Sequence, residues 1–131
     1  MKYNILILIP IILLQFSGFT QDPDATIDDI AGIIKTGDSR KLAGYFSSVV
    51  DLEIKDTDGS FNNTQAEIIM RDFFNYNKVK EFTVNHKGSS NEGSHYMIGS
   101  YKTSTQVFRV YILLKKSKEN LLIHKIQFEE D

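Results

Sequence analysis

The run QVFRVYILLKK, residues 106–116, restricts the fold of this 131-residue chain more than any other feature. Large apolar side chains occupy both alternating sets of positions, with Val110 and Ile112 on one side and Tyr111 and Leu113 on the other. This pattern indicates a central β-strand that is covered on one face and partly covered on the other. We therefore expect the flanking segments to form a sheet around this strand and the N-terminal half to cover it.

Composition sets limits on what the chain does. With 41% hydrophobic residues, it has enough apolar side chains to form the core of one domain. It contains no Cys, which excludes disulfides, thiolate metal sites and a Cys nucleophile. A formal net charge of −2 gives no reason to expect a nucleic-acid partner. No glycine-rich loop precedes a helix, so no nucleotide cofactor is expected.

The first 20 residues are typical of a secretory signal peptide. Lys2 supplies the positive start, residues 5–14 form a short apolar run, and small residues follow at 17–20. The apolar run is about half of the ~20 residues that span a bilayer, although an uncleaved anchor is an alternative. We expect residues 21–131 to form a single exported domain, periplasmic or secreted, that is free of the membrane after cleavage near residue 20.

Two helices are predicted at the start of the mature chain. Asp22 and Pro23 suit the first turn of a helix, and Gly37 suits its C-terminal cap. Asp38 or Ser39 then caps a second, shorter helix. A DNA-binding helix-turn-helix is a weaker interpretation, because the second helix carries few basic residues and the chain begins with an export signal.

A hairpin and a third helix follow. Alternation predicts a strand at 49–55, a turn at 56–59 with Gly59 at positive φ, and a short return strand at 60–62. The turn resembles the start of a calcium loop but lacks the later ligands. Thr64 to Glu67 fits a capping box, which predicts a helix from there to about residue 75.

The rest of the chain predicts an antiparallel meander, with strands at 81–89, 95–104, 106–116 and 121–129. Pairing His86 with Ile98, Ile98 with Val110, and Val110 with Ile126 keeps the apolar residues of all four strands on one face. In this register, three polar residues share the apolar, helix-covered face with the hydroxyl group of Tyr96; they are His86, Ser100 and His124.

The element order resembles that of the nuclear transport factor 2-like superfamily, in which a curved sheet wraps helices into a cone. The segments KTGDSRKLAGYFSSVVDLEIKD, TQAEIIMRDFF, VFRVYILLKK and LLIHKIQFEED are also similar to a family of short exported bacterial proteins of unknown function. The resemblance implies an α+β fold, with N-terminal helices on a curved, mostly antiparallel sheet like that of cystatin. It implies no reaction.

A ligand pocket is expected between the helices and the sheet. Its predicted lining, with the two histidines as polar contacts, is Tyr45, Phe46, Phe73, Tyr96, Ile112, His86 and His124. A small apolar molecule or a protein partner is the expected ligand.

The alternative is a small lyase or isomerase with His86 or His124 as base and Tyr96 as hydrogen-bond donor. A carboxylate base is missing from the predicted sheet face, and Asp51 and Asp72 are the plausible internal carboxylates. The two histidines would lie about 14 Å apart, three strand spacings, so no metal site is expected.

The opposite face of the sheet predicts a second binding surface. Its large apolar side chains, which we expect to be neighbours, are Met97, Tyr111, Leu113 and Ile123. An apolar patch with a basic rim fits a partner or a second copy of the chain, although scattered surface apolar residues are the alternative. Members of the superfamily that the chain resembles often pair through this face, which implies a homodimer.

Overall fold

The computed structural model describes residues 22–90 and 92–131, so the predicted signal peptide lies outside it. The helices are α1 (Pro23–Thr36), α2 (Ser39–Ala43) and α3 (Asn63–Tyr76). The strands are β1 (Phe46–Ile54), β2 (Thr57–Asn62), β3 (Glu81–Ser89), β4 (Ser94–Lys102), β5 (Val107–Ser117) and β6 (Asn120–Glu130). None of the helices in this part of the chain is long and apolar enough to cross a membrane.

The predicted ends of α1 and the start of α2 are confirmed. The Asp22 carboxylate accepts a hydrogen bond from the backbone N–H of Asp24, and Pro23 occupies the first turn. Gly37 ends the helix with φ 67° and ψ 31°, the left-handed conformation that glycine adopts without strain. The Asp38 carboxylate accepts from the N–H of Lys41 at 3.0 Å and caps α2.

The predicted hairpin exists, but its turn lies earlier in the chain. Ile54 pairs with Thr57, so Lys55 and Asp56 form the turn, and Lys55 adopts φ 49°. Gly59 lies inside β2, and the expectation of positive φ at this residue was wrong. The cap of α3 also differs, because the Asn62 side chain, not that of Thr64, accepts the N–H of Gln65.

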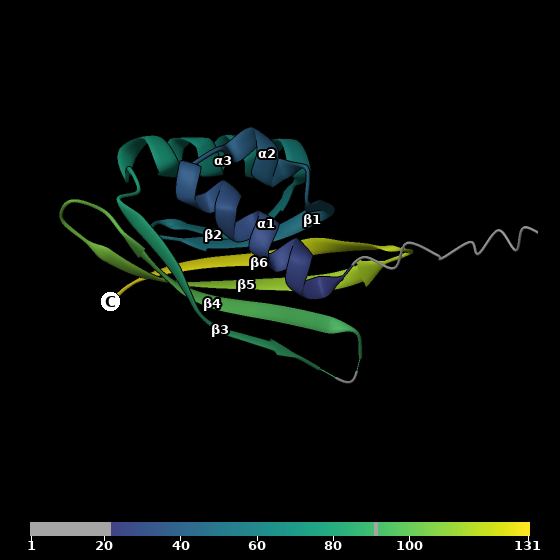
Figure 1. Cartoon of the computed structure of the whole chain (residues 1–131). Coiled ribbons are helices and arrows are strands. Elements are labelled where there is room, and N and C mark those ends of the chain that lie inside the picture. Colours follow the sequence, from purple (N-terminus) through teal and green to yellow (C-terminus); the bar gives the residue numbers. More distant parts are fainter. Residues whose placement is uncertain (1–21, 91) are drawn as a thin grey trace, which may run out of the picture.

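The described residues form a six-stranded sheet in the order β2-β1-β6-β5-β4-β3. β1 and β6 pair in parallel, and the other neighbours are antiparallel. All three helices lie on one side of the sheet, and the opposite side carries no helix in this part of the chain (Figure 1). The α+β class and the mostly antiparallel sheet are therefore confirmed. We call the side under the helices the inner face and the other side the outer face.

The register of the sheet differs from the prediction between β4 and β5. His86 pairs with Ile98 as expected, but Ile98 pairs with Tyr111 and not with Val110. A loop from Thr103 to Gln106 sets this offset. The Thr103 hydroxyl accepts the backbone N–H of Gln106 at 2.9 Å, and the Thr103 N–H donates to the Gln106 carbonyl, also at 2.9 Å. A shift of one residue exchanges the two faces of a strand.

Two β-bulges complete the sheet. In β3, Val84 pairs with Gly99 but His86 pairs with Ile98, which leaves Asn85 as the extra residue. In β6, the partners of Leu113 and Leu114 are Lys125 and Ile123, so His124 is the extra residue. Val110 faces Phe128, two residues beyond the predicted Ile126, because the turn that pairs Ser117 with Asn120 shifts the register by one residue and the bulge shifts it by another.

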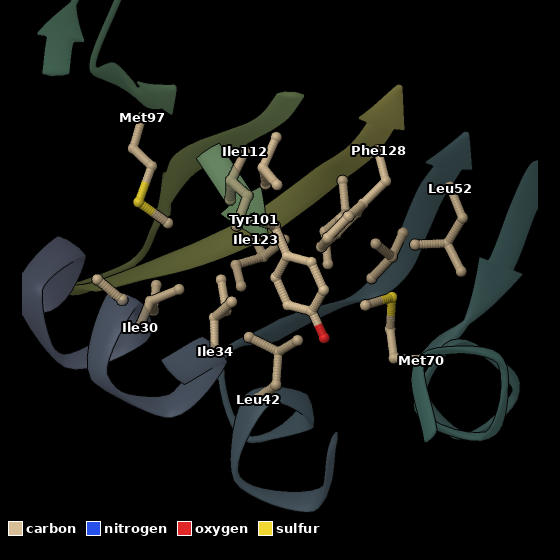
Figure 2. Packing of buried hydrophobic residues seen from close by; sticks show 14 of the residues in the cluster. Ile30, Ile34, Leu42, Leu52, Met70, Met97, Tyr101, Ile112, Ile123 and Phe128 are labelled. Atoms are coloured by element: carbon tan, nitrogen blue, oxygen red, sulfur yellow. The ribbon is translucent and has the colours of Figure 1, made fainter. Parts of the chain in front are cut away.

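These shifts reverse the predicted faces of β4 and of β3 from His86 onward, whereas Phe82 stays buried on the inner face as predicted. Met97 and Ile123, predicted on the outer face, are fully buried against the helices, and Figure 2 shows them on the same side as Ile30 and Ile34 of α1. His86, Tyr96, Ile98 and Ser100 move to the outer face.

The inner face is filled by an aromatic cluster. The Phe73 ring on α3 lies 4.5 Å from the Phe128 ring and 5.3 Å from the Phe108 ring, measured between centroids. The fully buried Tyr101 donates its O–H to the Asn77 carbonyl at 2.6 Å, and burial raises the pKa of Tyr101 to about 12. Side chains therefore occupy the space in which the sequence predicted a pocket.

Candidate functional site

The outer face carries a compact apolar group over its central strands. We call it the outer-face strip: Tyr96 and Ile98 of β4 with Tyr111 and Leu113 of β5. Ile98 lies opposite Tyr111, and Tyr96 lies opposite Leu113, so all four side chains are direct neighbours. The rings of Tyr96 and Tyr111 stack with centroids 6.2 Å apart. All four residues are partly exposed, although each is large and apolar.

Local chemistry on β3 holds Tyr96 in place. Gly88 lies opposite Tyr96, and a Cβ atom at Gly88 would collide with the Tyr96 ring. The missing side chain lets the ring lie across β3, where the Tyr96 hydroxyl reaches His86 Nε2 at 3.1 Å. The aromatic part of the outer-face strip is therefore ordered by Gly88 and His86 before any partner binds.

The rows of the outer-face strip continue into charged residues toward the other edge of the sheet. Tyr111 pairs with Gln127 on β6, which pairs with Glu53 on β1. Leu113 likewise pairs with Lys125, which pairs with Asp51. Lys125 Nζ lies 3.2 Å from the Glu53 carboxylate. The outer face thus combines an apolar half over β4 and β5 with a half of mixed charge over β6 and β1.

The structure does not bring the predicted pocket residues together. Phe46, Phe73 and Ile112 belong to the buried core, whereas Tyr96 and His86 lie on the outer face. Tyr45 packs at the edge of the core and lines a hollow beside α1, with a pKa raised by burial and by the Asp29 carboxylate. The structure therefore places the residues of the predicted lining at separate locations and not around one pocket.

His124 occupies the bulge of β6 and does not face His86 or Tyr96 across a pocket. Its Nε2 is buried and has no hydrogen-bond partner among the described residues. Burial, and secondarily the positive charge of Lys115, lowers the pKa of His124, while Asp51 acts in the opposite direction. A neutral imidazole is the form that this environment favours.

The alternative acid–base site is only partly assembled. His86 and Tyr96 are in contact, but His86 is exposed on the outer face. Asp51 is three strands away from Tyr96, about 14 Å, and accepts a hydrogen bond from the Ser60 hydroxyl. Asp72 is exposed on α3. Neither of the two carboxylates that the sequence offered, Asp51 and Asp72, therefore stands beside the His–Tyr pair.

Within residues 22–90 and 92–131, no group of three or more His, Cys, Asp or Glu side chains is arranged to hold a metal ion.

Sequence reasoning placed Tyr111 and Leu113 on the outer face, and the structure places them there. It missed Tyr96 and Ile98, which it assigned to the inner face. The loop between β4 and β5 contains the residue that could have corrected this assignment. The Thr103 side chain closes a four-residue turn, and this turn shifts the register between β4 and β5 by one residue.

Comparison with known proteins identifies the family. The sequence profile of the DUF4783 family, described as a domain of unknown function, matches residues 27–129. The chain belongs to the DUF4783 family. A DUF4783 family protein from Bacteroides ovatus is 33% identical, with a TM-score of 0.74 over 78% of this chain and 92% of the other. One from Bacteroides uniformis is 32% identical, with a TM-score of 0.75 over 79% and 95%.

The fold of this DUF4783 domain is nuclear transport factor 2-like, as the element order predicted. An NTF-2 like protein of unknown function from Silicibacter pomeroyi matches with a TM-score of 0.58 over 82% of this chain and 92% of the other. At 7% identity, this likeness concerns the fold alone. Comparison with curated proteins finds no match.

Proposed function

We propose that this DUF4783 domain is an exported, non-enzymatic binding module that pairs with a second copy of itself through the outer-face strip. The observation that carries the proposal is the apolar group formed by Tyr96, Ile98, Tyr111 and Leu113 on the sheet face that no described helix covers. Contiguous apolar groups of this kind are typical of interaction surfaces. The signal-like residues 1–20 support export.

The distribution of charge favours a second copy over an unrelated partner. A two-fold interface brings the same patch of both subunits together, so it must be complementary to itself. The outer face carries both signs of charge close to its apolar half, with Lys125 and Arg109 among the cations and Glu53 and Glu129 among the anions. Two such faces can place apolar against apolar and opposite charges at the rim.

The size of the outer face also fits a dimer. Six strands about 4.8 Å apart, with an average length of about 30 Å, make a face on the order of 800 Å². A standard interface buries about 800 Å² on each partner. Ordering of Tyr96 by Gly88 and His86 lowers the entropy that pairing must overcome.

Sedimentation velocity over a concentration series tests the proposal. The wild-type domain, residues 22–131, is expected to form a dimer whose fraction rises with concentration. Tyr111→Lys places a charge in the centre of the outer-face strip, and we expect it to weaken dimerisation by at least about tenfold, the effect of losing one central interface residue.

Ile68→Lys is the matched control, because Ile68 is 44% exposed on α3 and lies on the helical side of the molecule. It makes the same kind of substitution and should leave the dimer unchanged. A wild-type domain that stays monomeric at its highest soluble concentration would refute the proposal, as would equal weakening by both variants.

A further inference from the structure

A second surface, separate from the outer-face strip, lies where the end of α3 faces the turn between β1 and β2. The hollow there has a volume of about 480 Å³. One wall is the α3 stripe of Ile69, Asp72, Phe73 and Tyr76, which are spaced to face one side of a helix. The other wall is the turn itself, with its flanking residues, Ile54–Thr57.

The hollow is lined by aromatic rings. Phe73 is part of the core cluster but also lines the hollow, so the cluster forms the floor. Tyr76 stands at the rim and is 88% exposed, more than any other large apolar side chain of the described residues. The exposed Tyr76 ring is therefore free to contact a ligand held in the hollow.

An ammonium group already uses this aromatic region. Lys55 Nζ lies 5.6 Å from the centroid of the Phe108 ring, within the range of a cation–π contact. Lys55 adopts φ 49°, an uncommon backbone conformation for a residue with a side chain. The two-residue turn between Ile54 and Thr57 requires this conformation, and the Lys55 ammonium lies beside the aromatic cluster.

Charge at the hollow favours a further cation. Asp56 on the turn and Asp72 on α3 both line it, so its charged groups sum to a negative value even with Lys55 present. Arg71 approaches Asp72 only to 3.8 Å, and both side chains are exposed, so this ion pair leaves the carboxylate available. Carboxylates together with aromatic faces form the chemical environment that recognises organic cations.

We propose that this hollow binds a small organic ammonium compound, with its cationic group between Tyr76 and the carboxylates of Asp72 and Asp56. The apolar part of the ligand rests on Ile69 and Phe73. The volume of about 480 Å³ is within the usual range for small-molecule sites, about 300–1,000 Å³. Lys55 also lines the hollow, so its positive charge competes with a bound cation for the negative charge of Asp56 and Asp72.

Titration with a pair of isosteric probes tests this site by NMR. Choline carries a trimethylammonium group, and 3,3-dimethyl-1-butanol has the same shape without the charge. Choline is expected to shift the amide signals of residues 54–57 and 69–77 in a saturable way, and the neutral alcohol is not. Tyr76→Leu should weaken choline binding by about twofold to fivefold, the effect of one exposed cation–π contact, and Tyr76→Phe should preserve it.

Two further variants sharpen the test. Asp72→Asn keeps the shape of the side chain but removes its charge, so it should weaken choline binding, whereas Lys55→Met removes the competing cation and should strengthen it. Tyr111→Lys in the outer-face strip should leave choline binding unchanged, which separates this site from dimerisation. Failure of choline to bind, equal shifts by both probes, or choline binding that Tyr76→Leu and Asp72→Asn leave intact would overturn the proposal.

Discussion

The two faces of one sheet show opposite uses of aromatic side chains. On the inner face, Phe108 and Tyr101 are fully buried and pack ring against ring with Phe73 and Phe128. On the outer face, Tyr111 is only half-buried, although it is three residues from Phe108 on the same strand. Folding alone buries the aromatic rings of the inner face, whereas the rings of the outer face stay in contact with water. This difference between the faces is the basis of our proposal that a second copy covers the outer face.

The largest expected effect contrasts two aromatic residues of β5. Phe108→Ala removes a ring from the buried cluster and should lower the free energy of unfolding by about 3–5 kcal/mol, as for other large-to-small core substitutions. Tyr111→Ala is the matched change on the outer face and should cost the monomer much less. Urea unfolding at a concentration below dimerisation measures both, and equal losses would remove the distinction between the faces.

A smaller loss of stability is expected when either of the two glycines that face aromatic rings between β3 and β4 is replaced by alanine. A Cβ at Gly99 would lie 2.7 Å from the Thr83 carbonyl oxygen and 2.8 Å from the buried Phe82 ring. Neither group can retreat, so Gly99→Ala should cost about 1–3 kcal/mol. In Gly88→Ala, the new methyl group collides with the Tyr96 ring, but this ring can rotate toward solvent. The substitution should therefore destabilise the protein less than Gly99→Ala does.

The same two glycine variants separate stability from pairing. Gly88→Ala displaces Tyr96 from the outer-face strip, and we therefore expect weaker dimerisation in sedimentation experiments. Gly99→Ala changes the inner face and should leave dimerisation of the folded protein intact. A Gly88→Ala variant with wild-type dimerisation would show that the position of Tyr96 does not matter for pairing.

Tyr101→Phe tests the polar contact inside the core. The substitution keeps the ring but leaves the Asn77 carbonyl without its donor, which should cost about 1–2 kcal/mol in thermal or urea unfolding. Because the folded-state pKa of Tyr101 is about 12 and the usual value is 10.0, the wild type should lose stability as pH rises above 10. The variant should lack this part of the alkaline loss, and an unchanged alkaline profile would refute the assignment.

The smallest effect concerns His124. Burial and Lys115 lower its folded-state pKa below the usual 6.5, so the unfolded chain binds a proton at a higher pH than the folded one. Its contribution to stability is complete above pH 6.5 and is lost as pH falls toward the folded-state pKa. Thermal unfolding between pH 7.5 and 5.5 should therefore show a shallower decline for His124→Gln than for the wild type. Identical slopes would contradict this.

The sequence predicted the helices and strands better than the register between neighbouring strands. Caps such as Asp22 and Gly37 are local signals, and they marked the helix ends correctly. The faces of β4 could not be assigned from pattern, because Met97 and Ile98 are both apolar and either fits a core. The turn at Thr103 and the bulge at Asn85 determine which of the two faces the core. Both depend on backbone contacts that cannot be read from the spacing of apolar residues.

The candidate site inherits the same limit. Tyr111 and Leu113 could be placed on the outer face because β5 has a clear buried side, from Phe108 to Leu114. Their neighbours Tyr96 and Ile98 depended on the register between two strands, which hydrophobic pattern left undetermined.

The central claim is that two copies meet through the outer-face strip, and a cysteine scan tests it most directly. The chain contains no cysteine, so one introduced residue supplies the single thiol of each copy. Ile98→Cys treated with a short bismaleimide cross-linker should yield a covalent dimer at concentrations where Ile68→Cys on α3 does not. Cross-linking of both variants to the same extent, or of neither, would contradict the account.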